Sequence, residues 1–463
     1  MKIKITTRYK KILSDTYTPV AMYLKLRDEF PGALLLESSD YKDKLNHFSY
    51  LCLDAMASFD LKPTQMTLQY PDESQKFFEV KTNRPSNVLT DFINEFDVEK
   101  VPFDYITQGF FGYTTYDAIP YFEKIVTKPT DLSVPLMQYQ LHRLLIVFNH
   151  FHNELILIEH SLEGDESKFE TLEQLINHRA VQTYQFELKN EEKSNFTDAV
   201  FLEKINQGQS YCYTGDVFQL VLSRKFYHEF QGDEFNVYRA LSSINPSPYL
   251  FYFDYVNFKI FGSSPEAQLT VANKKATIHP IAGTFRRTGN LEQDKQLAQQ
   301  LSEDPKENAE HVMLVDLARN DLSKNSENVE VTHYKEIEFY SHVIHLVSKV
   351  TAQLIGTENS MRIFEDTFPA GTLSGAPKHR AMELIDSLEN ESRGFYGGAI
   401  GFIGFDGTLN HAIFIRSFVS KDYQLTYQAG CGIVTKSVPQ SELEEVDNKI
   451  SALRKALQLA ENL

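Results

Sequence analysis

Three absences narrow what this chain of 463 residues can be. Only three cysteines occur, Cys52, Cys212 and Cys431, and none forms a CxxC pair, so a disulfide framework is excluded and a zinc site is unsupported. No apolar run approaches the length of a membrane-spanning helix, and no apolar segment of a secretory signal follows the basic first residues. We therefore expect a cytoplasmic protein that has no membrane partner.

Basic residues are also scarce. The 46 Lys and Arg residues are outnumbered by 63 Asp and Glu residues, which gives a formal net charge of −17. A surface of this sign repels polyanions, so we expect no nucleic acid among the partners. The chain is nevertheless long enough for two ordinary domains or for one large intertwined one.

A change in composition divides the chain. Two β-branched apolar runs, 144–148 and 155–158, flank a polar stretch and predict a β-hairpin. From 161 to 197 the sequence is polar and charged, with one amphipathic segment around 169–176 and no strand signal. We place a boundary near residue 190, with a regulatory region over 1–190 that is intertwined with a catalytic domain over 191–463.

The second half contains strand patterns in runs, without regular alternation with helices. This arrangement favours an α+β fold with antiparallel sheets over a doubly wound one. The pair Asp406-Gly407 predicts a hairpin between the last two patterns. The predicted strands are 217–223, 249–255, 258–262, 267–271, 276–279, 398–405 and 412–419.

Two predicted helices carry acidic side chains. Asp304-Pro305-Lys306-Glu307 is a capping box, from which a helix should run to about residue 320. Glu307 and Glu310 then lie on one face of that helix. Near the C-terminus a second helix buries an apolar stripe, and Glu442, Glu445 and Lys449 follow the edge of the stripe.

If these two helices converge, four carboxylates meet, and a divalent cation or protonation must relieve their repulsion. Hard oxygen donors that leave room for water and substrate favour Mg²⁺. Acidic pairs on helices are, however, also typical of solvent-exposed faces, and spacing alone does not separate the two interpretations.

Several short motifs follow one another in a fixed order, and the match is strong over about 195–460 and weaker over the first 160 residues. Together they resemble the chorismate-utilising enzymes, and among these the component I chains of anthranilate synthase. That resemblance implies large antiparallel sheets packed as a β-sandwich with helices on the outside. The motifs are GDVFQLVLSR (215–224), GSSPE (262–266), PIAGT (280–284), DPKENAEH (304–311), SHVIH (341–345), PAGTLSGAPK (369–378) and QAGCGIV (428–434).

The resemblance implies a metal site and a substrate site. Glu310 and Glu445 resemble the direct Mg²⁺ ligands of the family, and Glu307 and Glu442 resemble the carboxylates that act through water. Tyr396 and Arg416 resemble the pair that holds the enolpyruvyl carboxylate of chorismate. The other expected substrate-binding residues are Gly283, Thr284, Gly430, Cys431, Gly432 and Lys449; Cys431 stands where the family usually has alanine.

Three residues resemble catalytic groups. Glu266 resembles the general acid that protonates the departing hydroxyl, a role that requires a carboxyl kept protonated by its surroundings. His345, with Thr372 nearby, resembles the histidine associated with loss of pyruvate. Without the family, Glu266 is simply a glutamate at a strand edge and His345 a buried core histidine.

The nucleophile is expected to be ammonia. Gln219 stands where isochorismate and salicylate synthases carry a lysine that activates water, and a neutral amide cannot serve as that base. Ala282 stands where aminodeoxychorismate synthases typically carry lysine. The sequence shows no amidotransferase elbow, so the resemblance implies a separate glutamine amidotransferase subunit, with two copies of each chain, in a cytoplasmic enzyme of tryptophan biosynthesis.

The resemblance also implies feedback inhibition by L-tryptophan. Leu35-Leu36-Glu37-Ser38 resembles the tryptophan-sensing motif of the family, and residues 245–249 complete it. The expected ligand contacts are Glu37, Ser38, Pro248, Tyr249 and Leu250, although Leu250 replaces the customary methionine and residues 46–50 match their block only loosely. The complete absence of tryptophan from the chain suits an enzyme that must be made when tryptophan is scarce.

Two alternatives stay open from the sequence. The chain could instead be component I of aminodeoxychorismate synthase, which shares substrate, metal and partner but does not release pyruvate. It could also be a catalytically silent chorismate or tryptophan sensor, although such a sensor has no need for the full set of acidic residues and His345.

Overall fold

The computed structural model describes residues 2–38, 48–103, 108–128, 133–339, 343–355 and 360–463. The side chain of Thr284 also lies outside this description. The helices are α1 (Pro19–Leu26), α2 (Pro85–Asn94), α3 (Phe169–His178), α4 (Asp198–Thr214), α5 (Phe235–Ile244), α6 (Leu291–Glu303), α7 (Pro305–Ser323), α8 (Ser360–Thr367), α9 (Lys378–Leu388) and α10 (Pro439–Ala460), with 3-10 turns η2 (Tyr116–Tyr121) and η3 (Gly371–Leu373).

The strands of the first half are β1 (Ile3–Leu13), β2 (Leu34–Glu37), β3 (Phe48–Leu61), β4 (Gln65–Gln69), β5 (Gln75–Glu79), β6 (Phe96–Val98), β7 (Gly109–Thr114), β8 (Met137–Asn149), β9 (Glu154–Ser161) and β10 (Phe186–Ser194). Those of the second half are β11 (Gln219–Gly232), β12 (Tyr249–Asp254), β13 (Lys259–Ser264), β14 (Ala267–Ala272), β15 (Lys275–Ile278), β16 (Ile281–Arg286), β17 (Ser326–Phe339), β18 (Val343–Leu354), β19 (Gly375–Ala376), β20 (Ala399–Gly404), β21 (Leu409–Ile413), β22 (Ser417–Lys421) and β23 (Gln424–Ile433).

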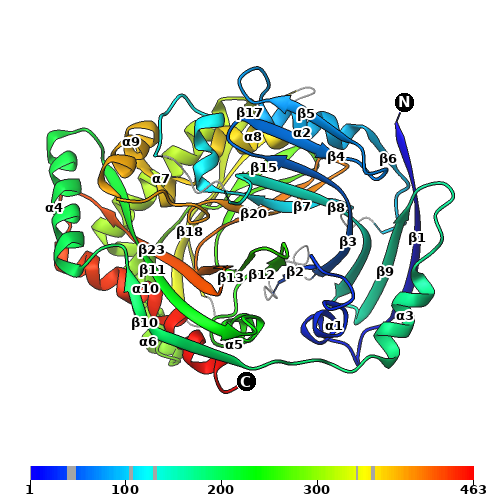
Figure 1. The fold of residues 1–463 in the computed structure, drawn as a ribbon. Coiled ribbons are helices and arrows are strands. Elements are labelled where there is room, and N and C mark those ends of the chain that lie inside the picture. The colour runs from blue at the N-terminus through cyan, green and yellow to red at the C-terminus, as the bar shows by residue number, and fades with distance from the viewer. Residues whose placement is uncertain (1, 39–47, 104–107, 129–132, 340–342, 356–359) are drawn as a thin grey trace.

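The strands form two large antiparallel sheets that share β3 and β8 (Figure 1). The first sheet has the order β10-β11-β23-β22-β13-β12-β2-β3-β8-β9-β1. The second has the order β5-β4-β3-β8-β7-β20-β21-β14-β15-β18-β17. Because β2 pairs with β12 and β7 pairs with β20, each sheet contains strands from both halves of the sequence.

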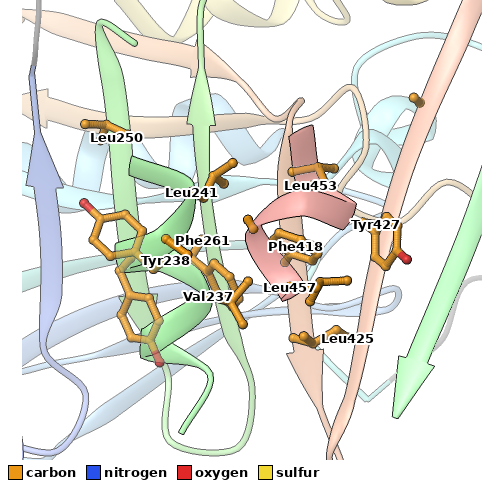
Figure 2. Packing of buried hydrophobic residues seen from close by; sticks show 14 of the residues in the cluster. Val237, Tyr238, Leu241, Leu250, Phe261, Phe418, Leu425, Tyr427, Leu453 and Leu457 are labelled. Carbon is orange, nitrogen blue, oxygen red and sulfur yellow. The ribbon is translucent and has the colours of Figure 1, made fainter. Parts of the chain in front are cut away.

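The period of two along the strands sends successive side chains to different cores. In β8, Leu145 and Val147 join the sandwich core between the two sheets, whereas Leu144 and Ile146 join the core under the helices. This helix-side core packs α5 and α10 on the first sheet, as Figure 2 shows for Leu241 and Leu453. Helices α2, α7 and α8 cover the second sheet in the same way. The predicted sandwich with helices on the outside is therefore confirmed.

Most predicted elements are present. The hairpin of 144–148 and 155–158 is β8 and β9, the amphipathic segment is α3, and the last helix is α10 with Leu443, Val446, Ile450, Leu453 and Leu457 buried. The segment 161–197, predicted to lack strands, contains β10, which pairs with β11 at the edge of the first sheet. The sequence of β10 is mostly charged because its side chains are largely exposed, so no hydrophobic alternation marks it.

The last predicted strand is wrong in one respect. The sequence predicts a continuous strand over 412–419, but β21 ends at Ile413 and β22 begins at Ser417. Between them Arg416 has a φ of 52°, which lies in the left-handed region and outside the regular β region. Arg416 is therefore in a break between two strands and is not a strand residue. The division of the chain near residue 190 stays a prediction.

None of the helices in the described part of the chain combines the length and apolar character that a membrane crossing requires.

Candidate active site

A cavity of about 570 Å³ opens beside β11 and β23, where the N-terminal parts of α7 and α10 approach the sheet. Its volume is in the range of ordinary small-molecule sites. The cavity lies mainly on one face of β23. Gln428, Gly430 and Gly432 line it, Tyr427 and Cys431 pack into the helix-side core, and Ala429 borders both. The strand period therefore separates a ligand face from a packing face.

The two acidic helices converge on this cavity. Glu307 and Glu310 from α7 line it together with Glu445 from α10. Gln219 Nε2 donates to Glu310 Oε1 over 2.8 Å, and Lys449 Nζ lies 2.6 Å from Glu445 Oε1. Burial, followed by repulsion from Glu310, raises the pKa of Glu307. The neighbouring carboxylates are thus close enough to Glu307 to disfavour its charged form.

The start of α7 explains this placement. Asp304 caps the helix and accepts hydrogen bonds from the backbone amides of Lys306 (2.8 Å) and Glu307 (3.0 Å). Glu307 does not complete the expected capping box, because its side chain lines the cavity instead. The cap thereby fixes the first turn while leaving the glutamate available to the site.

Arg416 and Tyr396 line the same cavity. Burial lowers the pKa of the Arg416 guanidinium, and among the described residues no carboxylate lies within ion-pair distance of it. Burial raises the pKa of Tyr396, so its hydroxyl stays protonated. A buried cation without a partner is costly unless a ligand supplies the anion. This part of the cavity is therefore suited to a carboxylate.

Glu266 contributes a carboxyl with an unusual pKa. Burial raises the pKa of Glu266 to about 7, against the opposing effect of a hydrogen bond from Thr372 Oγ1, which lies 2.9 Å from Glu266 Oε1. A carboxyl of this kind is substantially protonated at neutral pH and can act as a general acid.

His345 is held as a neutral ring. Its Nδ1 lies 3.0 Å from the carbonyl oxygen of Gly283, so Nδ1–H is the donor. Burial lowers the pKa of His345. The neutral tautomer has Nε2 as a proton acceptor.

Two glycines keep the cavity open. A Cβ atom on Gly432 would lie 2.8 Å from Gln219 Nε2. Gly283 has a φ of 71°, and its Cβ would lie 3.0 Å from Glu307 Oε2. Side chains at these positions would displace the groups that line the acidic part of the site.

The known proteins that resemble this chain agree with the geometry. A family model described as chorismate binding enzyme matches residues 34–455. The chain belongs to the chorismate-binding enzyme family. Anthranilate synthase component 1 of Aquifex aeolicus is 37% identical over 98% of this chain and 94% of the relative. Its counterpart from Thermus thermophilus is 36% identical over 98% of each chain.

Solved structures give the same assignment of fold. Anthranilate synthase component I from Streptococcus pneumoniae TIGR4 superposes with a TM-score of 0.78 at 31% identity and covers 96% of this chain and 99% of that one. MenF, the menaquinone-specific isochorismate synthase from Escherichia coli, superposes with a TM-score of 0.73 at 18% identity over 98% of this chain and 96% of that one, which shows a shared fold alone.

Within this member of the chorismate-binding family, most residues predicted for the site line the one cavity. They are Glu266, His345, Thr372, Gly283, Tyr396, Arg416, Gly430, Gly432, Lys449, Glu307, Glu310 and Glu445. Two of the predicted positions do not reach it with their side chains, and a third, Thr284, falls outside the described side chains.

Cys431 is predicted to contact substrate, but its side chain is fully buried in the helix-side core. The reason is strand parity, since Cys431 lies between the two glycines that face the cavity. Glu442 is also buried behind the cavity, and burial raises its pKa. One of its oxygens, Oε2, has no hydrogen-bond partner within the described part of the chain.

The donor set fits a magnesium ion. Among the described residues no three His, Cys, Asp or Glu side chains converge as a complete metal site. Mg²⁺ does not require one, because it keeps several waters and usually takes only one or two carboxylates plus substrate oxygens. Glu310 and Glu445 would supply that pair, and Glu442 Oε2, which has no partner among the described residues, is suited to an intervening water.

Several lining residues were not predicted as site residues, and some of them are polar. Lys306, Gln428 and Asn448 also face the cavity. Periodicity could have found two of them, because Asn448 follows Glu445 by three helical positions and Gln428 precedes Gly430 by two strand positions.

Two of the predicted tryptophan contacts lie on paired strands from the two halves of the chain. Strand β2 pairs with β12, so that Glu37 lies opposite Leu250. Tyr238 from α5 donates a hydrogen bond to Glu37 Oε1, and burial raises the pKa of that carboxyl. Residues 46 and 47 of the second predicted block lie outside the described residues.

Proposed function

We propose that this chain is the chorismate-converting subunit of anthranilate synthase, which combines chorismate with ammonia and forms anthranilate, pyruvate and water. The proposal depends on one observation: a single cavity contains the carboxylates of Glu310 and Glu445 and the guanidinium of Arg416, which has no ion-pair partner among the described residues. A dicarboxylate suits such a site, because a forked guanidinium binds one carboxylate directly and a bridging cation binds the other. The relatives named anthranilate synthase component 1 support this choice.

Glu310 and Glu445 would hold Mg²⁺ directly, with Glu307 and Glu442 acting through water. When bound, the ion would supply positive charge that holds the ring carboxylate and draws electron density from the ring. Arg416 and Tyr396 bind the enolpyruvyl carboxylate, and Lys449, Thr284 and the glycine backbones complete the contacts.

Proton transfer is assigned to two side chains. Glu266, oriented by Thr372, gives its proton to the 4-hydroxyl as that C–O bond breaks and water leaves. Ammonia forms the new C–N bond at the ring carbon adjacent to the one that bears the carboxylate. The new ammonium nitrogen returns one proton to the Glu266 carboxylate. The neutral ring of His345 then accepts the proton from the aminated carbon as the enolpyruvyl C–O bond breaks, and the departing enolate takes up that proton at its methylene carbon to become pyruvate.

The proposal extends to partners and regulation. A separate glutamine amidotransferase subunit supplies the ammonia in an assembly with two of each chain, and L-tryptophan inhibits through Glu37, Ser38, Pro248, Tyr249 and Leu250. We assign the enzyme to the cytoplasm, since its three cysteines are buried and free.

Because the chain contains no tryptophan, the fluorescence anisotropy of added L-tryptophan reports binding directly. If L-tryptophan gives no saturable signal, or if the Glu37→Gln variant binds it as tightly as the wild type, the proposed tryptophan site is wrong.

Turnover tests the reaction itself. With chorismate, ammonium and Mg²⁺, the chain should produce anthranilate fluorescence and an equal amount of pyruvate, and a chelator should abolish both. Glu310→Gln should lose this activity, whereas Glu444→Gln, on the exposed side of α10, should retain it. An amino product without pyruvate would indicate aminodeoxychorismate synthase instead, and no product at all would refute the enzyme.

A further inference from the structure

A buried ion pair lies directly behind the cavity. Arg393 and Glu389 are 1% and 5% exposed, and Arg393 binds both oxygens of the carboxylate, at 2.9 Å from Nε to Oε2 and 2.6 Å from Nη2 to Oε1. The same guanidinium donates to the carbonyl oxygens of Leu373 (2.6 Å) and Val221 (2.8 Å). Both of these residues line the cavity, so the pair supports its wall from behind.

The pair also reaches the cavity through a chain of hydrogen bonds. Glu389 Oε1 accepts from the backbone amide of Ser223 over 2.9 Å and from its hydroxyl over 2.7 Å. Gln428 Nε2 lies 2.7 Å from the same hydroxyl oxygen. Ser223 and Gln428 come from the paired strands β11 and β23, where Gly430 is opposite Ser223, so the two side chains are diagonal neighbours on one face.

This chain of contacts determines which way the amide of Gln428 points. A serine hydroxyl has only one proton, and that proton is committed to the Glu389 carboxylate, which can only accept. Ser223 Oγ must therefore accept from Gln428, so the NH₂ group faces Ser223 and the carbonyl oxygen Oε1 points away from it, on a side chain that lines the cavity. Among the described residues no donor is bonded to that oxygen, although Gln428 is only 8% exposed.

We propose that Gln428 is a substrate-contacting residue, whose carbonyl oxygen accepts a hydrogen bond from a donor on a bound ligand. Ser223, Glu389 and Arg393 are positioning residues that hold this orientation. The inference depends on the proposed function, which limits the donors to the hydroxyl of chorismate and the N–H groups of ammonia. A carbonyl oxygen repels carboxylates, so Gln428 also directs the two carboxylates of chorismate toward Arg416 and the acidic helices.

Gln428→Met tests the contact, because it keeps the length of the side chain and removes the acceptor. One lost hydrogen bond should raise a KM by about three- to tenfold. A rise in the KM of chorismate identifies the hydroxyl as the donor, and a rise in the KM of ammonium identifies ammonia. Ser223→Ala should raise the same KM to a smaller extent, since the amide is then free to rotate.

The matched control is Gln140→Met in β8, which lies outside the cavity lining and removes a half-buried glutamine whose Oε1 has no hydrogen-bond partner in the described part of the chain. It should leave both KM values unchanged, and all three variants should unfold thermally as sharply as the wild type. An active Gln428→Met enzyme with both KM values unchanged overturns the inference while the proposed function stands. If the wild type is inactive, calorimetric titration with chorismate decides: equal affinity of wild type and Gln428→Met, or no binding by either, also overturns it.

Discussion

Two side chains that line the cavity have pKa values that burial shifts in opposite directions. Burial raises the pKa of Glu266 to about 7 and lowers the pKa of Arg416. In both cases removal from water disfavours the charged form. Glu266 can therefore act as an acid at neutral pH. The charged form of Arg416, in contrast, is stabilised only when an anionic ligand binds beside it. Both effects lead to predictions about single residues.

Glu266→Gln should lower kcat by about 10²- to 10⁴-fold, the usual contribution of a general acid. In the wild type the acid form predominates below a pKa of about 7, so kcat/KM for chorismate should fall as the pH rises through that value. The measurement must hold the concentration of free NH₃ constant, since NH₃ itself increases with pH. A profile that stays flat between pH 6 and pH 8.5 would exclude Glu266 as the acid.

Arg416→Gln should bind chorismate more weakly while the protein becomes no less stable. Loss of charge-assisted hydrogen bonds should raise KM by about 10- to 100-fold, but removal of a buried, unpaired charge should leave the free energy of unfolding unchanged or higher. Chorismate kinetics and urea unfolding measure the two effects.

Arg224→Gln is the control for this prediction. Arg224 is also buried, but it is paired with Asp198 at 2.5 Å and lies outside the cavity lining. It should lose stability and retain KM. A destabilised Arg416→Gln protein would contradict the view that Arg416 awaits an external anion.

At the level of elements, the consecutive helices α6 and α7 begin with equivalent side-chain caps, but only α7 contributes residues to the cavity. Asn290 accepts from the amides of Glu292 (3.0 Å) and Gln293 (3.2 Å), as Asp304 does at the start of α7. Asp304→Ala and Asn290→Ala should each lower the free energy of unfolding by about 0.5–2 kcal/mol. Only Asp304→Ala should also raise the Mg²⁺ concentration for half-maximal activity, because the first turn of α7 presents Glu307.

Urea unfolding and Mg²⁺ titration of activity distinguish these two effects. If both variants shift the Mg²⁺ requirement equally, the cap acts through general stability and not through the position of Glu307.

The sequence predicted elements well where one physical pattern determined them. The stripe of α10 and the Asp304 cap are local signals, and the family resemblance identified many of the residues that line the cavity. Strand β10 was missed because an exposed edge strand has no apolar alternation. The break before Arg416 was missed because a positive φ at a residue other than glycine depends on tertiary contacts. The side chain of Cys431 was expected in the cavity because a motif specifies only a position in the chain. Which face of β23 a side chain occupies depends instead on the alternation along the strand.

At the scale of the whole molecule, the two halves of the sequence are joined within both sheets. Strand runs in the sequence indicated antiparallel sheets, but not that β2 would lie beside β12 or β7 beside β20. Such long-range pairing depends on complementary surfaces that come together only on folding, and local propensity does not encode it. The sandwich core likewise combines Leu34 and Phe111 from the first half with Phe251 and Ile400 from the second.

This mixing predicts that 191–463 will not fold alone, although the composition suggested a boundary near 190. Without 1–190, β12 and β20 each lose a paired neighbour, and the apolar residues of the sandwich core meet water. The isolated fragment should therefore show no cooperative urea transition and no turnover, and co-expression with 1–190 should restore both. A chain cut at Gly164 is the control, since this glycine has no neighbour within 4 Å of an added Cβ and the cut pieces should stay assembled. A fragment 191–463 with a sharp transition and native activity would instead make residue 190 a true domain boundary.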